Sequence, residues 1–329
     1  MTALPTAMTA LARSWLFVPA DSERKLARAR EVPADALILD LEDAVVPDRK
    51  PIARQMAAEF LRARHGEAAG RPVAGAASQT ASQTASPHRP ALWVRVNARS
   101  SGLLADDVRA IMPAGPDGLL LPKAESPEDL WALDALMAEA ERKTTPGMPA
   151  AIMALVSETP GAVLNLARYA WHADGQPARV PARLVALTWG GEDLSSELGA
   201  LTHRDADGEF RFTYQLARSG CQLAAAAAGV AAVETLCADF RNMDLVARQA
   251  SRAAEDGFIG MLAIHPSQVP VINAAFAPTP EQVQHAERVL AAFAAADAGQ
   301  GGAGAVQLDG RMLDRPHRTQ AERLLGRVR

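Results

Sequence analysis

Acidic side chains follow directly after apolar runs at two places in this sequence, a placement that suits metal binding. Glu158 follows "AIMALVS", and Asp193 follows "RLVALTWGGE". Mg²⁺ prefers hard carboxylate oxygens and keeps several positions for water or substrate oxygens. If the two apolar runs are neighbouring strands, one divalent cation can bind between the two acids. Each acid also has a structural interpretation, because Glu158 can cap the helix begun by "TPGAV" and Asp193 can be an N-cap.

An arginine and three further acids extend this pattern. Asp40, Glu42 and Asp43 end the run "ALILDLED", and Arg95 lies in "LWVRVNA". An arginine can hold a substrate carboxylate with two parallel hydrogen bonds. Pairing with an acid of "DLED" is the structural alternative for Arg95. The three acids can orient metal-bound water, and a structural salt-bridge role is equally open to them.

Four bases crowd behind the first apolar run, "SWLFVPA", and point to an anionic ligand. The chain has 329 residues and a formal net charge of -4. No overall field would therefore gather nucleic acid or an anionic membrane, so an anion must be met by a local basic patch. The bases are Arg24, Lys25, Arg28 and Arg30.

Strand-like runs alternate with helical segments and predict the element order that would position these side chains. The runs are mostly continuous apolar stretches, as expected for parallel strands buried on both faces. Eight such units favour an α/β protein with a closed (β/α)8 TIM barrel over residues 13–275. An open doubly wound sheet remains the alternative, because the seventh run is weak. The expected strands are Ser14–Ala20, Ala36–Glu42, Leu92–Ala98, Gly118–Ala124, Ala151–Thr159, Arg183–Gly191, Ala231–Phe240 and Phe258–Pro266.

Two regions fall outside the alternation. Residues 66–90, with "SQTASQTAS" near their centre, predict a flexible insertion before the third strand. Residues 276–329 predict a C-terminal helical extension of the barrel. It contains a helix begun by Pro280 and Glu281, a glycine-rich stretch over residues 299–304, and a last short helix from about Asp314.

The cysteine content and the length of the apolar segments indicate the cellular compartment. The two cysteines, Cys221 and Cys237, are expected to be buried, inert thiols in a reducing environment. No apolar segment reaches the ~20 residues that span a bilayer, and the start of the chain lacks a basic region before an apolar core. We therefore expect a cytoplasmic protein with no membrane and no nucleic-acid partner.

Two other residues invite catalytic interpretations. Lys123 ends a predicted barrel strand, where it could form a Schiff base with a carbonyl substrate, although the carboxylate pair favours a metal mechanism. His265, in "IHPSQ", is expected to be a hydrogen-bonded structural histidine rather than a base.

Eight motifs, in order along the chain, carry a family resemblance. They are "LFVPADSERKLARA", "ILDLEDAVVPDRK", "VRVNA", "LLLPKAES", "ALVSETPGAV", "LTWGGEDLSSELG", "GFIGMLAIHPSQV" and "DGRMLDRPHRTQAERLL". Together they resemble the CitE-like branch of the HpcH/HpaI aldolase superfamily, which includes the citrate lyase beta subunit, malyl-CoA lyases and citramalyl-CoA lyases. Met261 departs from the lysine of many relatives, and Ser157 precedes the glutamate; either difference can alter the acyl preference.

The resemblance implies a Mg²⁺-dependent (β/α)8 lyase, with Mn²⁺ as a substitute, that cleaves or forms a carbon–carbon bond in 3-hydroxyacyl thioesters. Glu158 and Asp193 match the metal ligands, and Arg95 matches the arginine that holds the carboxylate of the 2-oxo acid. The remaining matches are Phe17, Arg24 and Arg28 at the CoA-binding position, and Asp40, Glu42 and Asp43 around the metal.

The resemblance also implies a mobile general acid/base. Asp314, in "MLDRP", matches an aspartate on a C-terminal lid that an adjoining subunit usually donates, which implies a homotrimer or hexamer. Three functions are compatible with these matches. They are a stand-alone CoA-ester lyase, a citrate lyase beta subunit that acts on a substrate carried by an acyl-carrier protein, and a non-catalytic paralogue that binds CoA esters. The presence of Glu158, Asp193, Arg95 and Asp314 argues against the third.

Overall fold

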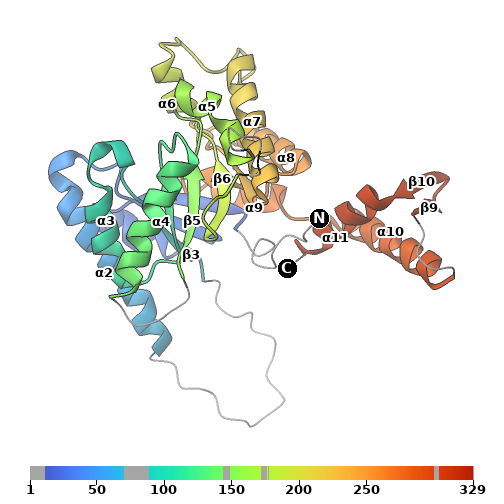
Figure 1. Ribbon diagram of the computed structural model, residues 1–329, viewed down its shortest axis with the longest axis horizontal. Helices are drawn as coiled ribbons and strands as arrows, with labels where there is room; N and C mark the ends of the chain where they lie inside the picture. Colours follow the sequence, from blue (N-terminus) through green and yellow to red (C-terminus); the bar gives the residue numbers. More distant parts are fainter. Residues whose placement is uncertain are drawn as a thin grey trace, which may run out of the picture. The chain divides into compact units, whose positions relative to one another are not determined.

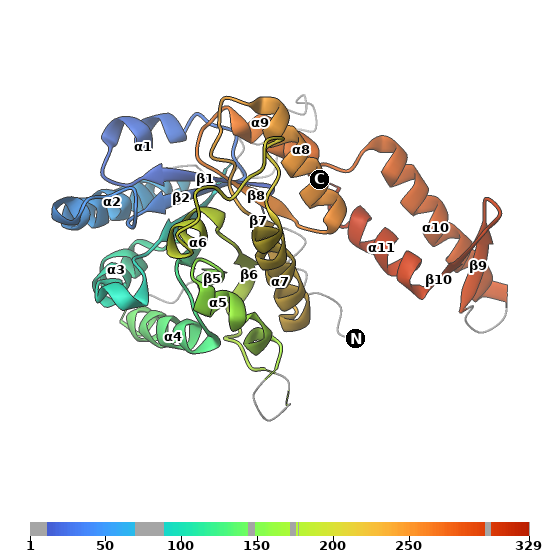
Figure 2. The same cartoon turned by 90° about the horizontal axis from the view of Figure 1, so that it is seen from above.

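The computed structural model describes residues 12–69, 89–143, 149–171, 176, 178–299 and 304–328. Eight parallel strands close into a barrel in chain order, so the prediction of a (β/α)8 fold is confirmed and the open sheet is wrong. Figures 1 and 2 show the strands within a ring of helices. The strands are Ser14–Pro19 (β1), Ala36–Asp40 (β2), Ala91–Arg95 (β3), Gly118–Leu121 (β4), Ala151–Leu155 (β5), Leu184–Thr188 (β6), Ala231–Glu234 (β7) and Gly260–Ala263 (β8).

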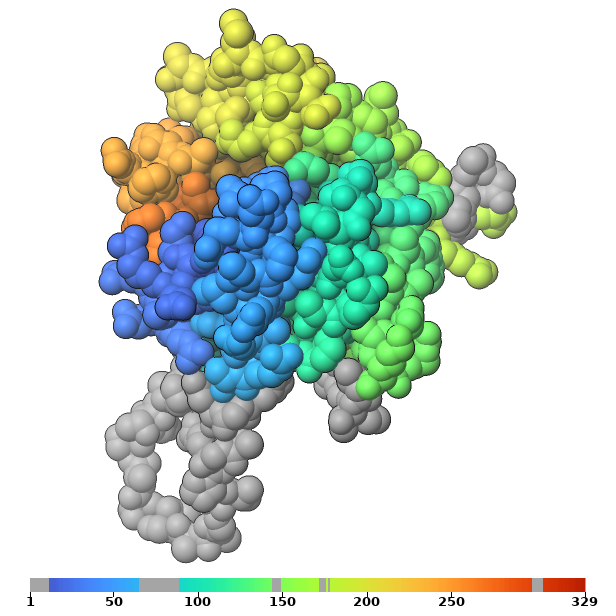
Figure 3. All heavy atoms as spheres, turned by 90° about the vertical axis from the view of Figure 1, so that its left-hand side faces the viewer, coloured from blue at the N-terminus to red at the C-terminus, as the bar shows by residue number. Residues whose placement is uncertain are grey.

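Helices connect successive strands and cover the outside of the barrel. Figure 3 shows α2, α3 and α4 side by side on one outer face, in blue, teal and green. The helices of this part are Glu23–Ala29 (α1), Lys50–Ala69 (α2), Leu104–Ile111 (α3), Pro127–Glu141 (α4), Pro160–Leu164 (α5), Gly191–Glu197 (α6), Phe212–Ala228 (α7), Met243–Asp256 (α8) and Gln268–Ala275 (α9). Short 3-10 turns cover Pro47–Arg49, Arg99–Ser101, Met112–Ala114 and Leu166–Tyr169.

The barrel strands are apolar because both of their faces are buried. Every residue of β2, β4, β7 and β8 is buried. At one end of the barrel the rings of Trp15 and Trp93 meet edge to face, with centroids 5.2 Å apart. Gly118 is required beside them, because a Cβ there would overlap the ring of Trp93. The seventh strand is shorter than predicted, since only Ala231–Glu234 pairs with its neighbours.

The predicted insertion begins later than the sequence indicated. Helix α2 continues to Ala69, so residues 66–69 are helical. Their sequence, "GEAA", ends in good helix formers, which outweigh the single glycine. Residues 70–88 lie outside the described residues, and the prediction of flexibility for them stays a prediction.

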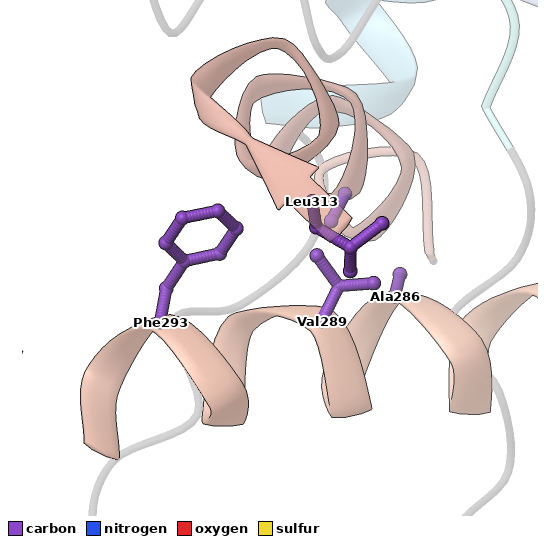
Figure 4. Close-up of a cluster of buried hydrophobic side chains, with 5 residues drawn as sticks. Ala286, Val289, Phe293 and Leu313 are labelled. Carbon is purple, nitrogen blue, oxygen red and sulfur yellow. The ribbon is translucent and has the colours of Figure 1, made fainter. Parts of the chain in front are cut away.

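Residues from Phe276 onward belong to a compact unit of their own, separate from Ala12–Ala275. It contains α10 (Pro280–Gly299), β9 (Ala305–Leu308), β10 (Arg311–Asp314) and α11 (Arg315–Leu325). In Figure 4, three side chains of α10 project toward Leu313 of β10. The buried core of this unit consists of Ala286, Val289, Phe293, Leu313 and Ala321.

The sequence prediction missed the hairpin of this unit. β9 and β10 pair antiparallel, with Leu308 opposite Arg311. Asp309 and Gly310 form the two-residue turn, with φ of 51° and 75°. Positive φ at both positions matches the twist of a hairpin and favours an Asp-Gly turn. The neighbouring glycines hid this signal, whereas the last helix begins where predicted, after Asp314.

Two expectations from composition can be compared with the structure. Cys221 and Cys237 are free, buried thiols, and burial raises the pKa of both. A thiol with a raised pKa is a poor nucleophile. Within the described ranges, no helix is both long enough and apolar enough to cross a bilayer.

Candidate active site

A cavity of about 930 Å³ opens at the carboxyl ends of the barrel strands. This is where (β/α)8 enzymes place their chemistry. The cavity brings together side chains from β1, α1, β2, β3 and the segments after β5 and β6, which are far apart in sequence. Of the predicted site residues, those lining it are Phe17, Arg24, Arg28, Asp40, Asp43, Arg95, Glu158 and Asp193. Glu42 lies behind this lining.

Glu158 is a buried carboxylate at the edge of the cavity, with 2% of its surface exposed. Its Oε2 accepts a hydrogen bond from the backbone N–H of Lys123 at 2.5 Å. Burial raises the pKa of the Glu158 carboxyl well above its usual value, and the charges of Asp193 and Glu42 add to the rise. The interpretation of Glu158 as a helix cap is wrong, because Thr159 caps α5.

Asp193 lies in the first turn of α6, and its side chain is 38% exposed. The residue at the N-cap is Gly190, so the N-cap interpretation of Asp193 is also wrong. Its Oδ1 lies 3.7 Å from the Nζ of Lys123. Asp193 therefore faces the same cavity as Glu158, from the next strand of the barrel.

Arg95 is bound to a protein carboxylate in the structure. The register aligns Arg95, the last residue of β3, with Asp40, the last residue of β2. Its Nε and Nη2 donate to the two carboxylate oxygens of Asp40, both at 2.7 Å. Nη1 lies 3.0 Å from Glu42 Oε2, and the guanidinium carbon lies 4.7 Å from the centre of the Phe17 ring. The alternative that Arg95 pairs with an acid of "DLED" is thus observed.

The electrostatics of Arg95 follow from this pairing. Only 12% of its side chain is exposed, and burial alone would lower the pKa of the guanidinium. The charge and hydrogen bonds of Asp40, together with the charges of Glu42 and Glu158, outweigh burial and raise that pKa. Arg95 nevertheless lines the cavity, and its contact with a substrate carboxylate stays a prediction.

Lys123 is tied into the acidic cluster and does not line the cavity among the described residues. Its Nζ lies 2.6 Å from Glu42 Oε1 and 3.3 Å from Asp43 Oδ1. Burial alone would lower the pKa of the ammonium, but the hydrogen bond to Glu42 and the charges of Glu42, Asp193 and Asp43 raise it. A protonated amine has no lone pair for a carbonyl, so the geometry disfavours the Schiff-base mechanism.

Helix α1 carries basic side chains to another part of the cavity wall. Ser22 caps the helix, and its side chain accepts a hydrogen bond from the N–H of Lys25. Arg24, Lys25 and Arg28 all line the cavity. Arg30, the fourth base, lies instead over the ring of Phe60, 4.7 Å from its centre. Three of the four bases therefore form one basic wall, as an anionic ligand would require.

Sequence analysis missed the residues that hold the turn before Asp193. Trp189 lines the cavity, and its Nε1 donates to Glu234 Oε1 at 2.6 Å. Arg218 binds the other oxygen of Glu234 at 2.6 Å. Glu234 is fully buried at the end of β7. The sequence did offer one signal for these contacts, because Glu234 is a lone acid at the end of an otherwise apolar strand.

His265 fits its predicted structural role. Its Nδ1 lies 2.7 Å from Ser267 Oγ, and its ring stacks on Phe240 with centroids 4.8 Å apart. The residue also lines the cavity. Its ring is therefore fixed by local contacts at the rim.

The residues present fit a hard divalent cation. In the part of the chain that the structure describes, no group of three or more His, Cys, Asp or Glu side chains has an arrangement that could hold a metal ion. Glu158 and Asp193 would thus be the two protein ligands, and other positions would stay open, as Mg²⁺ allows. Burial and, to a smaller extent, the carboxylates of Asp193 and Glu42 raise the pKa of Glu158, and a bound cation would favour its ionised form.

Asp314 belongs to the separate C-terminal unit, and its local geometry is defined there. It is the N-cap of α11, and its side chain is 52% exposed. Its Oδ1 lies 2.6 Å from Nδ1 of His317, and its backbone N–H donates to the same nitrogen at 3.2 Å. The structure shows an accessible carboxyl, and its catalytic role stays a prediction.

Comparisons with known proteins place this chain in a family. The family described as HpcH/HpaI aldolase/citrate lyase matches residues 13–70 and 63–266. The chain is 31% identical over 316 residues to the (3S)-malyl-CoA thioesterase of Cereibacter sphaeroides, covering 96% of this chain and 94% of that protein. It is 30% identical over 316 residues to the mitochondrial citramalyl-CoA lyase of Mus musculus, covering 95% of this chain and 85% of that protein.

A crystal structure gives a similar result. CitE of Mycobacterium tuberculosis in complex with magnesium, acetoacetate and coenzyme A superposes with a TM-score of 0.69 and 31% identity, covering 97% of this chain and 98% of that chain. The identity, the coverage and the barrel agree, and this chain belongs to the HpcH/HpaI aldolase/citrate lyase family.

Proposed function

We propose that this protein is a Mg²⁺-dependent carbon–carbon lyase. It cleaves a 3-hydroxyacyl-CoA, such as malyl-CoA or citramalyl-CoA, into acetyl-CoA and a 2-oxo acid, or forms that bond in reverse. The observation that carries the proposal is that the buried carboxylate of Glu158 and the carboxylate of Asp193 line the same cavity at the carboxyl ends of the strands. A relative's crystal complex with magnesium, acetoacetate and coenzyme A supports it.

The reaction sets clear demands on the site. The hydroxyl proton passes to a base or to water at the site, the O–H electron pair forms the new carbonyl, and the electrons of the broken carbon–carbon bond pass to a thioester enolate. A bound Mg²⁺ would supply charge stabilisation at the oxygen that becomes the carbonyl. Glu158 and Asp193 would hold it, and the Arg95–Asp40 pair beside them keeps one wall of the cavity fixed.

The basic wall formed by α1 suits the phosphates of coenzyme A, the carrier of the acyl group. CoA bears phosphates, and Arg24, Lys25 and Arg28 project from one short helix at the cavity. Phe17 adds an aromatic surface next to them. These residues would bind the carrier while the acyl group reaches the acidic cluster. Arg95 would contact the carboxylate of the 2-oxo acid through its Nη1, which that carboxylate would share with Glu42.

The enolate must then be protonated at carbon. We propose that Asp314 supplies this proton, from the C-terminal unit of an adjoining copy in a homotrimer or hexamer. Its carboxyl is accessible and held at the N-terminus of α11. A donor on a separate unit can approach after the substrate binds, which would exclude water at the moment of proton transfer.

The proposal is tested by turnover with Mg²⁺ and a panel of 3-hydroxyacyl-CoA esters, following release of acetyl-CoA and 2-oxo acid. We expect cleavage of at least one ester, its loss on chelation, and its loss in Glu158→Gln and Asp193→Asn. Glu197→Gln is the matched control, because this acid is exposed at the end of α6. A citryl group on an acyl-carrier protein is included, since turnover of that substrate alone would indicate a citrate lyase beta subunit. No turnover of any substrate, with normal CoA-ester binding, would indicate a non-catalytic paralogue.

A further inference from the structure

Lys123 contacts both proposed metal ligands with different parts of one residue. Its backbone N–H donates to Glu158 Oε2. Its ammonium lies 3.7 Å from Asp193 Oδ1. Glu158 follows β5 and Asp193 lies in α6, so a residue after β4 links acids from the next two units of the barrel.

The backbone of Lys123 adopts a conformation that lysine rarely takes. Its φ is +49°, which places it in the left-handed region. Such strain persists only where the surroundings enforce it, and it concentrates at functional sites. Here the next residue is anchored, because the N–H of Ala124 donates to Leu155 O at 3.0 Å. Lys123 is thus held in place at the junction of β4 and β5, with its N–H directed at Glu158.

The ammonium is shared among several acids. It lies 2.6 Å from Glu42, 3.3 Å from Asp43 and 3.7 Å from Asp193. Arg95, the other cation of the cluster, is bound chiefly to Asp40 and Glu42. Among the described residues, Lys123 is therefore the cation of this cluster that pairs with Asp193.

We infer that Lys123 is a positioning residue whose ammonium takes the place of the metal ion at Asp193 and thereby limits the affinity of the site for divalent cations. This inference rests on the metal site proposed above. A metal ion held by Glu158 and Asp193 would compete with the ammonium for the Asp193 carboxylate. The metal ion and the ammonium would also repel each other, because both would lie in the same acidic cluster. The ammonium keeps the metal-free cluster stable, and the metal exchanges readily as a result.

If the ammonium limits the affinity for Mg²⁺, removing it should strengthen Mg²⁺ binding, whereas loss of a purely structural residue should weaken Mg²⁺ binding or leave it unchanged. In Lys123→Met the stem remains and the charge is lost. We expect the affinity for Mg²⁺, measured by calorimetry without substrate, to increase by about tenfold, because a nearby like charge is removed. The metal-free variant should melt at a lower temperature than the parent, and Mg²⁺ should raise its melting temperature by more than it raises the parent's.

Three further variants separate the charge from other effects. Lys123→Gly adopts positive φ without strain and removes the ammonium, so it should bind Mg²⁺ more tightly even if Lys123→Met does not fold. Lys123→Arg keeps the charge and should bind Mg²⁺ with the parent's affinity. Lys50→Met is the control, because the Lys50 ammonium is bound by Leu41 O, Glu42 O and Asn97 Oδ1, outside the carboxylate cluster. It should lower the melting temperature and leave the affinity unchanged.

Unchanged or weaker Mg²⁺ binding in folded Lys123→Met or Lys123→Gly would overturn the inference and leave the proposed lyase function intact. Absence of Mg²⁺ binding in the parent and in every variant would overturn the metal site and this inference together.

Discussion

Arg95 and Asp40 are register partners on neighbouring strands, and their side chains form a two-point ion pair inside the barrel mouth. The planar guanidinium and the carboxylate match in geometry, and the pair is almost entirely buried. Breaking it removes the two-point partner of a buried guanidinium, which then has only Glu42 and Asp43 near its Nη1. Its first role is therefore to fix the mouth of the barrel.

We expect Asp40→Asn to lower the free energy of unfolding by about 2 kcal/mol, because the buried guanidinium loses its two-point charged partner and keeps only the acids on its other side, Glu42 and Asp43. Chemical denaturation measures the change. Asp106→Asn is the control, since Asp106 binds Arg109 in an exposed pair and its loss should not be measurable. Equal effects of the two substitutions would contradict a structural role for the Arg95 pair.

Binding of Mg²⁺ is expected to depend on pH through Glu158. Burial and the charges of Asp193 and Glu42 raise the pKa of this carboxyl well above 4.5. A metal ligand must be deprotonated, so affinity should decrease as pH falls through the raised pKa and should be constant well above it. Calorimetry in two buffers with different ionisation enthalpies would detect the proton released on binding.

The same pKa shift determines how the metal-free protein responds to pH. Because the folded-state pKa lies above the unfolded-state value, the contribution of Glu158 to stability is fully present below about pH 4.5 and is lost as pH rises through the folded-state pKa. Glu158→Gln should lack this decline. A metal affinity that does not change with pH would show that Glu158 is ionised throughout.

The basic wall predicts a separate effect on substrate binding. Replacing Arg24 and Arg28 together by glutamine should raise KM for a CoA thioester by about tenfold, with little change in metal affinity, because two charge-assisted contacts to the carrier are lost. Arg30→Gln is the matched control, since Arg30 stacks on Phe60 and does not line the cavity among the described residues. A parent-like KM in the double variant would place the carrier elsewhere.

Asp314 is expected to act in trans. Asp314→Asn should abolish turnover and enolate proton exchange with little change in substrate or metal binding. Asp309→Asn is the control, because Asp309 is exposed in the hairpin turn of the same unit, and Asn tolerates its positive φ.

Mixed oligomers test the subunit boundary directly. Combining Asp314→Asn with Glu158→Ala protein should restore part of the activity, because some sites would pair an intact metal centre with an intact acid. No recovery in verified mixed oligomers would show that the acid works within its own chain.

Much of the fold followed from the sequence, and the site only in part. Eight apolar runs predicted the barrel because parallel strands buried on both faces need continuous apolar sequence. The placement of Glu158 and Asp193 at one cavity followed from their positions after β5 and β6.

The sequence left two partners open for Arg95, a substrate carboxylate and an acid of "DLED", because its pairing with Asp40 depends on strand register. The left-handed backbone of Lys123 had no sequence signal, since it arises from tertiary packing. Glu234 stood out as a lone acid at the end of an apolar strand, but its partner Trp189 could not be identified without the packing. The hairpin of the C-terminal unit did have a signal, the Asp309–Gly310 turn, which nearby glycines obscured.

The C-terminal unit has a core of its own, in which Leu313, next to Asp314, packs with Phe293 and Val289 of α10. Such a core gives the unit its own cooperativity of unfolding, distinct from that of the barrel. With Asp314 acting as proposed, heat would inactivate the enzyme by melting this small unit while most of the chain stays folded. The temperature at which activity is lost would therefore report on side chains such as Phe293, which take no part in the chemistry.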